Sequence, residues 1–91
     1  PTGVRAAVSN LIMRILFFAQ LKDATGCSEV EWPDVGPLRS DDIWERLERE
    51  WPAVAEHRRN TRLARNGEYV PGNERFEPDD EVALIPPVSG G

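Results

Sequence analysis

The sequence predicts an α+β fold: a mixed sheet of roughly four to five strands packed on one main helix. The chain has 91 residues, 40% hydrophobic and 30% charged, which suits one small domain with a single core. One amphipathic helical stripe lies near the middle of the chain. Short apolar segments bounded by turn residues flank it on both sides, as expected for strands.

The first strand is predicted over residues 13–19, which are apolar and favour β structure. Alternation places Phe17 on one face of this strand and Leu16 and Phe18 on the other. Residues 1–12 are interpreted as an N-terminal extension or a remnant of cloning, because the only methionine opens the strand. No function is expected for them.

A turn and a second strand follow. Residues 23–26 (Asp-Ala-Thr-Gly) carry a turn signal, and residues 28–32 alternate between polar and apolar side chains. The first two strands are therefore expected to form a hairpin. Residues 33–37 contain two prolines and a glycine and are expected to form a loop.

The main helix is predicted to begin at Ser40, a suitable N-cap. Asp41 and Asp42 then place negative charge near the positive end of the helix dipole. The apolar stripe expected to face the core consists of Ile43, Trp44, Leu47 and Trp51. Pro52 ends the helix, and residues 53–57 can add a short helical turn.

Three strands are predicted in the rest of the chain, over residues 62–65, 68–70 and 81–85. The Asn-Gly pair at 66–67 is a strong hairpin signal between the first two of them. The Pro-Pro pair at 86–87 ends the last strand, since neither residue can donate to a ladder.

This order of two strands, one helix and three strands matches the β-grasp arrangement of ubiquitin-like domains. The domain is predicted to span residues 13–87. Residues 88–91 are then a flexible tail that ends in Gly-Gly.

Composition excludes several classes of function. The net charge of -5 argues against nucleic acid as a partner and favours a basic protein surface. The longest apolar run, residues 15–19, is far below the ~18 residues of a membrane helix, so no membrane partner is expected. Cys27 is the only cysteine and His57 the only histidine, so no intrachain disulfide or metal site is expected and a cytoplasmic location is favoured. No enzyme motif occurs.

The Gly90-Gly91 ending suggests chemistry at the carboxyl end. A carboxylate is a poor electrophile, and adenylation by ATP activates it. Glycine has no Cβ and can enter a narrow channel, while Pro86 and Pro87 keep the tail extended. The activated end can take up sulfur to form a thiocarboxylate, or react with an amine to form an amide.

Residues 80–91 (Asp-Glu-Val-Ala-Leu-Ile-Pro-Pro-Val-Ser-Gly-Gly) resemble the ending of the small subunit of molybdopterin synthase. Residues 16–19 (Leu-Phe-Phe-Ala) resemble the first strand of that family, and residues 64–66 also fit it. The resemblance covers about residues 13–91. Asp79 departs from the family, which often has glycine before Asp-Glu, and this difference concerns the local turn.

The resemblance implies that Gly91 is adenylated by an enzyme of the ubiquitin-activating type and then carries a thiocarboxylate. The large subunit of the synthase would move this sulfur to cyclic pyranopterin monophosphate. The family pairs two small with two large subunits, and the catalytic residues belong to the large subunit. The chain alone is therefore expected to be no enzyme and to bind no cofactor, Gly91 carrying first adenylate and then sulfur.

A patch on the open face of the sheet is the expected docking surface. If Phe17 and Leu84 face the helix, alternation turns Phe18 and Ile85 to the other side. The expected partner contacts are Phe18, Tyr69, Ile85, Pro86, Pro87, Val88 and Ser89, and the reactive residues are Gly90 and Gly91. A second core under a loop is the alternative interpretation of the three large side chains.

Three other functions remain open. One is a thiocarboxylate sulfur carrier for thiamine, cysteine or tRNA thiolation, against which the paired prolines argue. Another is a ubiquitin-like protein modifier, for which Lys22, the only lysine, limits chain building on itself. The third is an interaction domain without tail chemistry.

Overall fold

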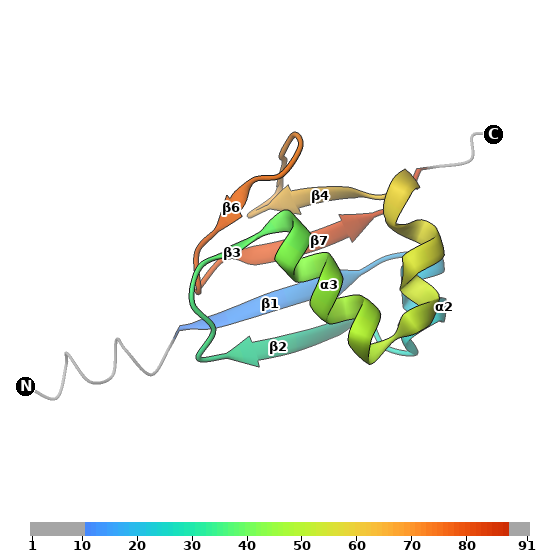
Figure 1. The fold of residues 1–91 in the computed structure, drawn as a ribbon, viewed down its shortest axis with the longest axis horizontal. Helices are drawn as coiled ribbons and strands as arrows, with labels where there is room; N and C mark the ends of the chain where they lie inside the picture. Colours follow the sequence, from blue (N-terminus) through green and yellow to red (C-terminus); the bar gives the residue numbers. More distant parts are fainter. Residues whose placement is uncertain (1–10, 88–91) are drawn as a thin grey trace, which may run out of the picture.

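One five-stranded mixed sheet carries the fold, and a helix crosses one of its faces (Figure 1). The computed structural model describes residues 11–87. The strands are β1 (Ile12–Phe17), β2 (Glu29–Pro33), β3 (Leu38–Arg39), β4 (Arg62–Arg65), β5 (Glu68–Tyr69), β6 (Arg75–Phe76) and β7 (Glu81–Ile85). The helical segments are α2 (Gln20–Thr25), α3 (Ser40–Glu50) and the 3-10 segment η1 (Pro52–Asn60).

The main sheet has the strand order β2-β1-β7-β4-β5, and a second, two-stranded sheet pairs β3 with β6. The first and last strands of the main sheet, β1 and β7, are parallel neighbours at the centre of that sheet. Strands β2 and β4 flank them in antiparallel pairing. This mixed sheet on one main helix confirms the predicted α+β class.

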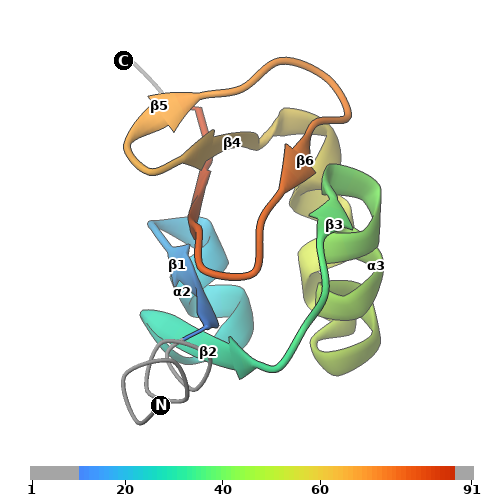
Figure 2. The same cartoon turned by 90° about the vertical axis from the view of Figure 1, so that its left-hand side faces the viewer.

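The core lies between the main sheet and α3, and Figure 2 shows the helix on one side of the sheet. Phe17 and Leu84 are direct partners in β1 and β7, and both are buried. Trp44 is buried, and Trp51 is half-buried with its ring edge-on to Phe17, 5.7 Å between centroids. The prediction that both tryptophans belong to the core or its edge is confirmed. None of the described helices has the length and apolar character needed to cross a membrane.

The connection between the first two strands differs from the prediction. β1 and β2 pair antiparallel as expected, but β1 ends at Phe17, two residues early. Ala19, with φ 50°, turns the chain, and α2 then fills the connection. The predicted turn signal is the end of this helix, where Gly26 takes a left-handed conformation with φ 78°. With six residues and one buried side chain, Leu21, α2 is too short for a periodic pattern.

The small sheet of β3 and β6 was not predicted from the sequence. Each strand has two residues, and Leu38 pairs with the distant Phe76. Such short strands are below the length at which alternation can be recognised. The 3-10 segment η1 is also longer than the short turn expected over residues 53–57.

Ser40 does not cap the helix. Arg39 occupies the N-cap position, and its backbone N–H donates to the Asp42 carboxylate at 3.0 Å. Ser40 is the first helical residue and is 4% exposed. Its Oγ accepts a hydrogen bond from the Glu74 backbone N–H at 3.0 Å. The serine therefore ties α3 to the chain that leads into β6.

The hairpin between β4 and β5 confirms the sequence prediction. Asn66 and Gly67 both have positive φ, 52° and 89°, as the common two-residue hairpin turn requires. The Asn66 side chain also accepts the Glu81 N–H at 2.9 Å and donates to Asp80 at 3.0 Å. This turn therefore anchors the beginning of β7.

We predict that Ser40→Ala lowers the free energy of unfolding by about 1–3 kcal/mol, because the Glu74 N–H loses its side-chain acceptor in a partly buried place. Ser28→Ala is the matched control, since Ser28 is exposed, and it should stay within about 0.5 kcal/mol of wild type. Urea denaturation measures both. Equal effects of the two substitutions would contradict the tethering role of Ser40.

Candidate functional site

The face of the main sheet opposite α3 carries the candidate site, and strand pairing decides which side chains share it. Leu16 lies opposite Ala83 in the neighbouring strand. Ala83 lies opposite Ala64, which in turn lies opposite Tyr69. One row of side chains thus crosses the sheet from β1 to β5. No helix within residues 11–87 covers this side, as Figure 2 shows.

Phe18 and Ile85 belong to this open face. Each comes one residue after a buried partner, since Phe17 pairs with Leu84 on the core side. Phe18 is 45% exposed, and Ile85 is half-buried. The predicted assignment of strand faces is therefore confirmed, and the alternative of a second core over Phe18 is not supported.

Tyr69 lies at the far edge of the same face, on the short strand β5. Its side chain is 54% exposed. The Arg62 guanidinium stands over its ring, 4.4 Å from the centroid, in a cation–π contact. Arg62 is also the direct partner of Ile85 across the β4–β7 pair. An arginine thus lies between the exposed tyrosine and the end of β7.

The chain leaves the sheet beside this face. β7 runs between β1 and β4 toward the end of the molecule where η1 lies (Figure 1). Of the two prolines after Ile85, Pro86 is buried and Pro87 is exposed. Pro86 therefore exposes little of its own surface, and its contact with a partner stays a prediction, as does that of Pro87. The predicted tail residues Val88, Ser89, Gly90 and Gly91 lie outside the described residues.

The sequence prediction named neither Leu16 nor Arg62 as contact residues. Alternation had placed Leu16 on the same face as Phe18, so the signal for it was present. Arg62 carried no such signal, because its position depends on pairing with Ile85 and on the contact with Tyr69.

Charged groups border the apolar part of the open face. Arg14 lies on β1 and forms an ion pair with Glu81, 3.7 Å between nitrogen and oxygen. Glu31 lies opposite Arg14, and Glu29 lies opposite Leu16, both on the edge strand β2. Both glutamates are exposed. The β2 edge of the face is thus acidic.

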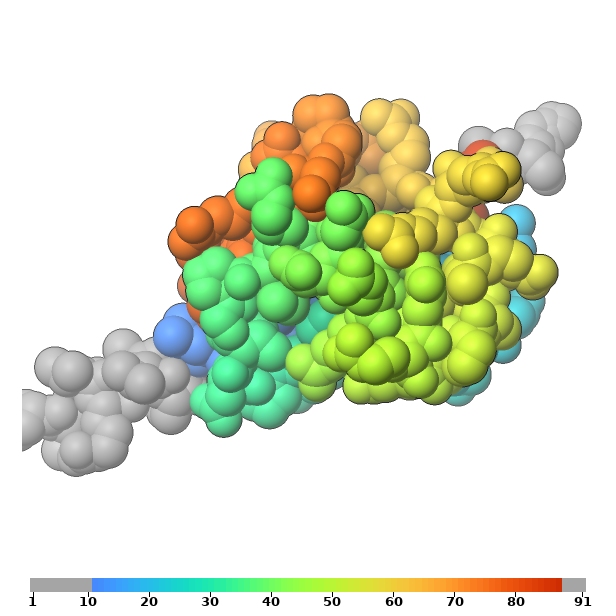
Figure 3. All heavy atoms as spheres, in the orientation of Figure 1, coloured from blue at the N-terminus to red at the C-terminus, as the bar shows by residue number. Residues whose placement is uncertain are grey.

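The helix side carries a hollow of about 350 Å³ between α3, η1 and β4. Arg58 lines it and is paired with both Asp41 at 3.0 Å and Glu48 at 3.1 Å. Figure 3 views this side, where α3 and η1 cover the sheet. The Arg58 cation already has carboxylate partners, so this hollow has the character of a structural ion-pair cluster.

Cys27 and His57, the only cysteine and the only histidine, each contact a near neighbour in the sequence. Cys27 is half-buried, and its Sγ lies 3.7 Å from the Thr25 hydroxyl. The Nε2 of His57 lies 3.5 Å from the carboxylate of its neighbour Glu56. Across residues 11–87, no three His, Cys, Asp or Glu side chains are gathered as metal ligands.

Curated relatives identify the family of this chain. The molybdopterin synthase sulfur carrier subunit of Chlamydomonas reinhardtii is 30% identical over 81 residues, covering 87% of this chain and 98% of that protein. The human protein of the same name is 29% identical over 82 residues, covering 87% and 93%. These relatives confirm the resemblance recognised in the sequence.

Solved structures share the fold. SAMP1 from Haloferax volcanii has a TM-score of 0.71 at 30% identity, covering 88% of this chain and 99% of that chain. A putative molybdopterin converting factor, subunit 1, from Pyrococcus furiosus has a TM-score of 0.72, covering 86% and 99%. Because the sequence identity to this second structure is 23%, the similarity shows a shared fold alone. Residues 15–91 match the ThiS family, and the chain therefore belongs to this family of ubiquitin-like β-grasp proteins.

Proposed function

We propose that this chain is the sulfur carrier subunit of molybdopterin synthase and that Gly91 carries the sulfur as a thiocarboxylate. The observation that carries the proposal is the apolar open face joined to the end of β7. Phe18 and Ile85 offer surface for docking at the point where the chain leaves the sheet. The name of the curated relatives and a family match that extends to Gly91 support the same function.

The proposed reaction at the tail has two activation steps. The Gly91 carboxylate attacks the α-phosphorus of ATP on an activating enzyme, forms an acyl adenylate and releases pyrophosphate. A sulfide or persulfide donor then supplies sulfur to the carbonyl carbon, and AMP leaves; a persulfide donor also needs a reductant to cleave its S–S bond. The product is a thiocarboxylate.

The large subunit supplies the catalysis in this proposal. It holds the thiocarboxylate against cyclic pyranopterin monophosphate, to which the sulfur is transferred, and the Gly91 carboxylate is restored by water. A dithiolene needs two sulfurs, so each product molecule consumes two thiocarboxylates of this chain. The expected assembly pairs two small subunits with two large ones. This chain is then a sulfur donor without catalytic residues of its own.

Docking and chemistry are divided between two parts of the chain. Burying each large apolar side chain contributes roughly 1.5–3 kcal/mol, whereas ordering each tail residue costs roughly 1–2 kcal/mol. The open face, whose side chains are already placed by the sheet, therefore supplies most of the net affinity. The tail supplies the reacting atoms.

A protein modifier is the second candidate function. A second similar structure, that of small archaeal modifier protein 1 from Haloferax volcanii, has a TM-score of 0.72 at 27% identity. The same adenylated tail would then react with a lysine amine rather than with sulfur. Conjugates of high mass that carry this chain in cell extracts would favour this function.

We predict that incubation with ATP, the activating enzyme and a sulfide donor exchanges one oxygen of the chain for one sulfur, detected by intact-mass analysis. Deletion of Gly91 should abolish sulfur transfer and leave the melting temperature unchanged, because the core lies within residues 13–84. An unchanged mass with a competent enzyme would exclude every thiocarboxylate function. A large fall in melting temperature on deletion would show that the tail packs on its own domain.

We predict that Phe18→Asp weakens binding of the large subunit about tenfold or more, because it places a charge without a partner in an apolar contact. The isolated domain should stay folded, since Phe18 is exposed while Phe17 fills the core. Ala55→Asp is the control, because Ala55 is exposed on η1. Calorimetric titration and a melting curve measure the two effects. Unchanged affinity, or collapse of the isolated domain, would refute this assignment of the open face.

A further inference from the structure

Arg62 is the cation at the β4 border of the open face. The structure holds its guanidinium over the Tyr69 ring at 4.4 Å, next to Ile85 in the sheet register. Among residues 11–87, no carboxylate lies within 4.0 Å of it. By contrast, Arg14 on the same face and Arg58 on the helix side both have carboxylate partners. Arg62 is therefore positioned by an aromatic ring while its charge is left for another group.

The opposite border of the open face has the opposite charge. Glu29 and Glu31 are exposed on the edge strand β2, and pairing with β1 places both on this face. In the described part of the chain, neither makes a salt bridge with an arginine or lysine. Apolar side chains of β1 and β7 separate these glutamates from Arg62. The face thus has an apolar centre between an acidic border and a cationic border.

We infer that this charge pattern selects a partner surface of matching polarity and sets its orientation. The partner is expected to present a carboxylate to Arg62, a basic side chain to Glu29 and an apolar surface to Phe18 and Ile85. Rotation of the partner by half a turn would bring like charges together at both borders, which disfavours that orientation. The inference rests on the proposed function, because the partner it addresses is the large subunit of molybdopterin synthase.

The orientation has a chemical consequence. The tail leaves the sheet from β7, between the two borders. A partner that docks in one orientation receives the tail at one place on its own surface. The charged borders therefore act as positioning elements that direct the tail toward the partner's active site, and Arg62 is a positioning residue in this sense.

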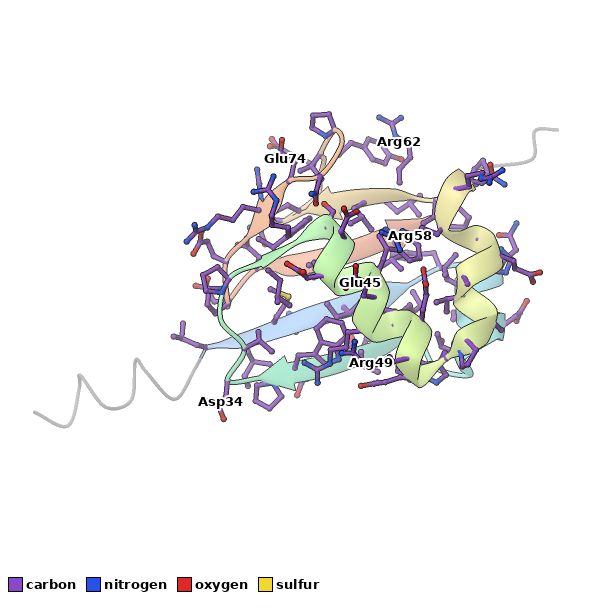
Figure 4. The ribbon with its side chains drawn as sticks, viewed as in Figure 1. Asp34, Glu45, Arg49, Arg58, Arg62 and Glu74 are labelled. Carbon is purple, nitrogen blue, oxygen red and sulfur yellow. The ribbon has the colours of Figure 1, made fainter. Side chains whose placement is uncertain are left out.

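The test compares charge reversals on the two sides of the sheet, with the purified large subunit as the probe. Arg62→Glu and Glu29→Arg reverse the two borders of the open face. Arg49→Glu and Glu45→Arg make the same changes at exposed positions on α3, and Figure 4 shows these two side chains on the helix, away from Arg62. Binding is measured by calorimetry, association rates at several salt concentrations, and folding by melting curves.

We expect each open-face reversal to weaken binding about tenfold or more and to slow association, most at low salt, while the α3 reversals stay within about twofold. An acidic residue of the large subunit can also be changed to a basic one. If that change restores binding of the Arg62→Glu chain, it identifies the carboxylate that faces Arg62. If Arg62→Glu changes the fold, Arg62→Leu removes the charge and should still weaken binding and reduce its salt dependence.

Three results would overturn the inference. Open-face reversals that bind like wild type, while Phe18→Asp fails to bind, would leave the proposed function standing and refute the role of the charges. Equal losses from the α3 and open-face reversals would show that the effect does not depend on which side of the sheet carries the charge, and would refute the inference. A wild-type chain that does not bind the large subunit would refute both the proposed function and this inference.

Discussion

The parallel pairing of β1 with β7 is the constraint on which the rest of the structure depends. It joins the first strand to the last at the centre of the sheet, so Phe17 and Leu84 meet on the side of α3. Burial of this pair and its neighbours stabilises the domain. The same pairing turns Leu16 and Ala83 outward together. The core and the open face are therefore two consequences of one register.

The position of β7 also decides where the tail begins. A chain that ended at an edge strand would release its tail to one side of the sheet. Here the last strand has a neighbour on each side, and Ile85 pairs directly with Arg62. Buried Pro86 keeps the root of the tail packed before exposed Pro87. In the proposed function, a docked partner therefore meets a rigid apolar surface and the start of the tail at the same place.

Arg58 and Arg62 lie on opposite sides of the sheet and are held in different ways. On the helix side, Arg58 is held by two carboxylates and contributes to packing between α3 and η1. On the open face, Arg62 is held by an aromatic ring instead, and among residues 11–87 no carboxylate pairs with it. Exposed ion pairs such as Arg14–Glu81 add little to stability. In the proposed docking mode, the charges at the borders of the open face contribute to recognition of the partner.

The sequence by itself determined the fold class, the faces of the long strands and the family. The faces on which Phe17 and Phe18 lie follow from alternation, and the hairpin turn at Asn66-Gly67 follows from turn chemistry. Both signals are local in the sequence. Only the tertiary structure decided the role of Ser40 and the position of Arg62. The Ser40 hydroxyl accepts a hydrogen bond from the backbone of Glu74, 34 residues away, and Arg62 is paired with Ile85 in the neighbouring strand. Their partners are distant in sequence, and no local pattern encodes a contact that forms only when the chain has closed.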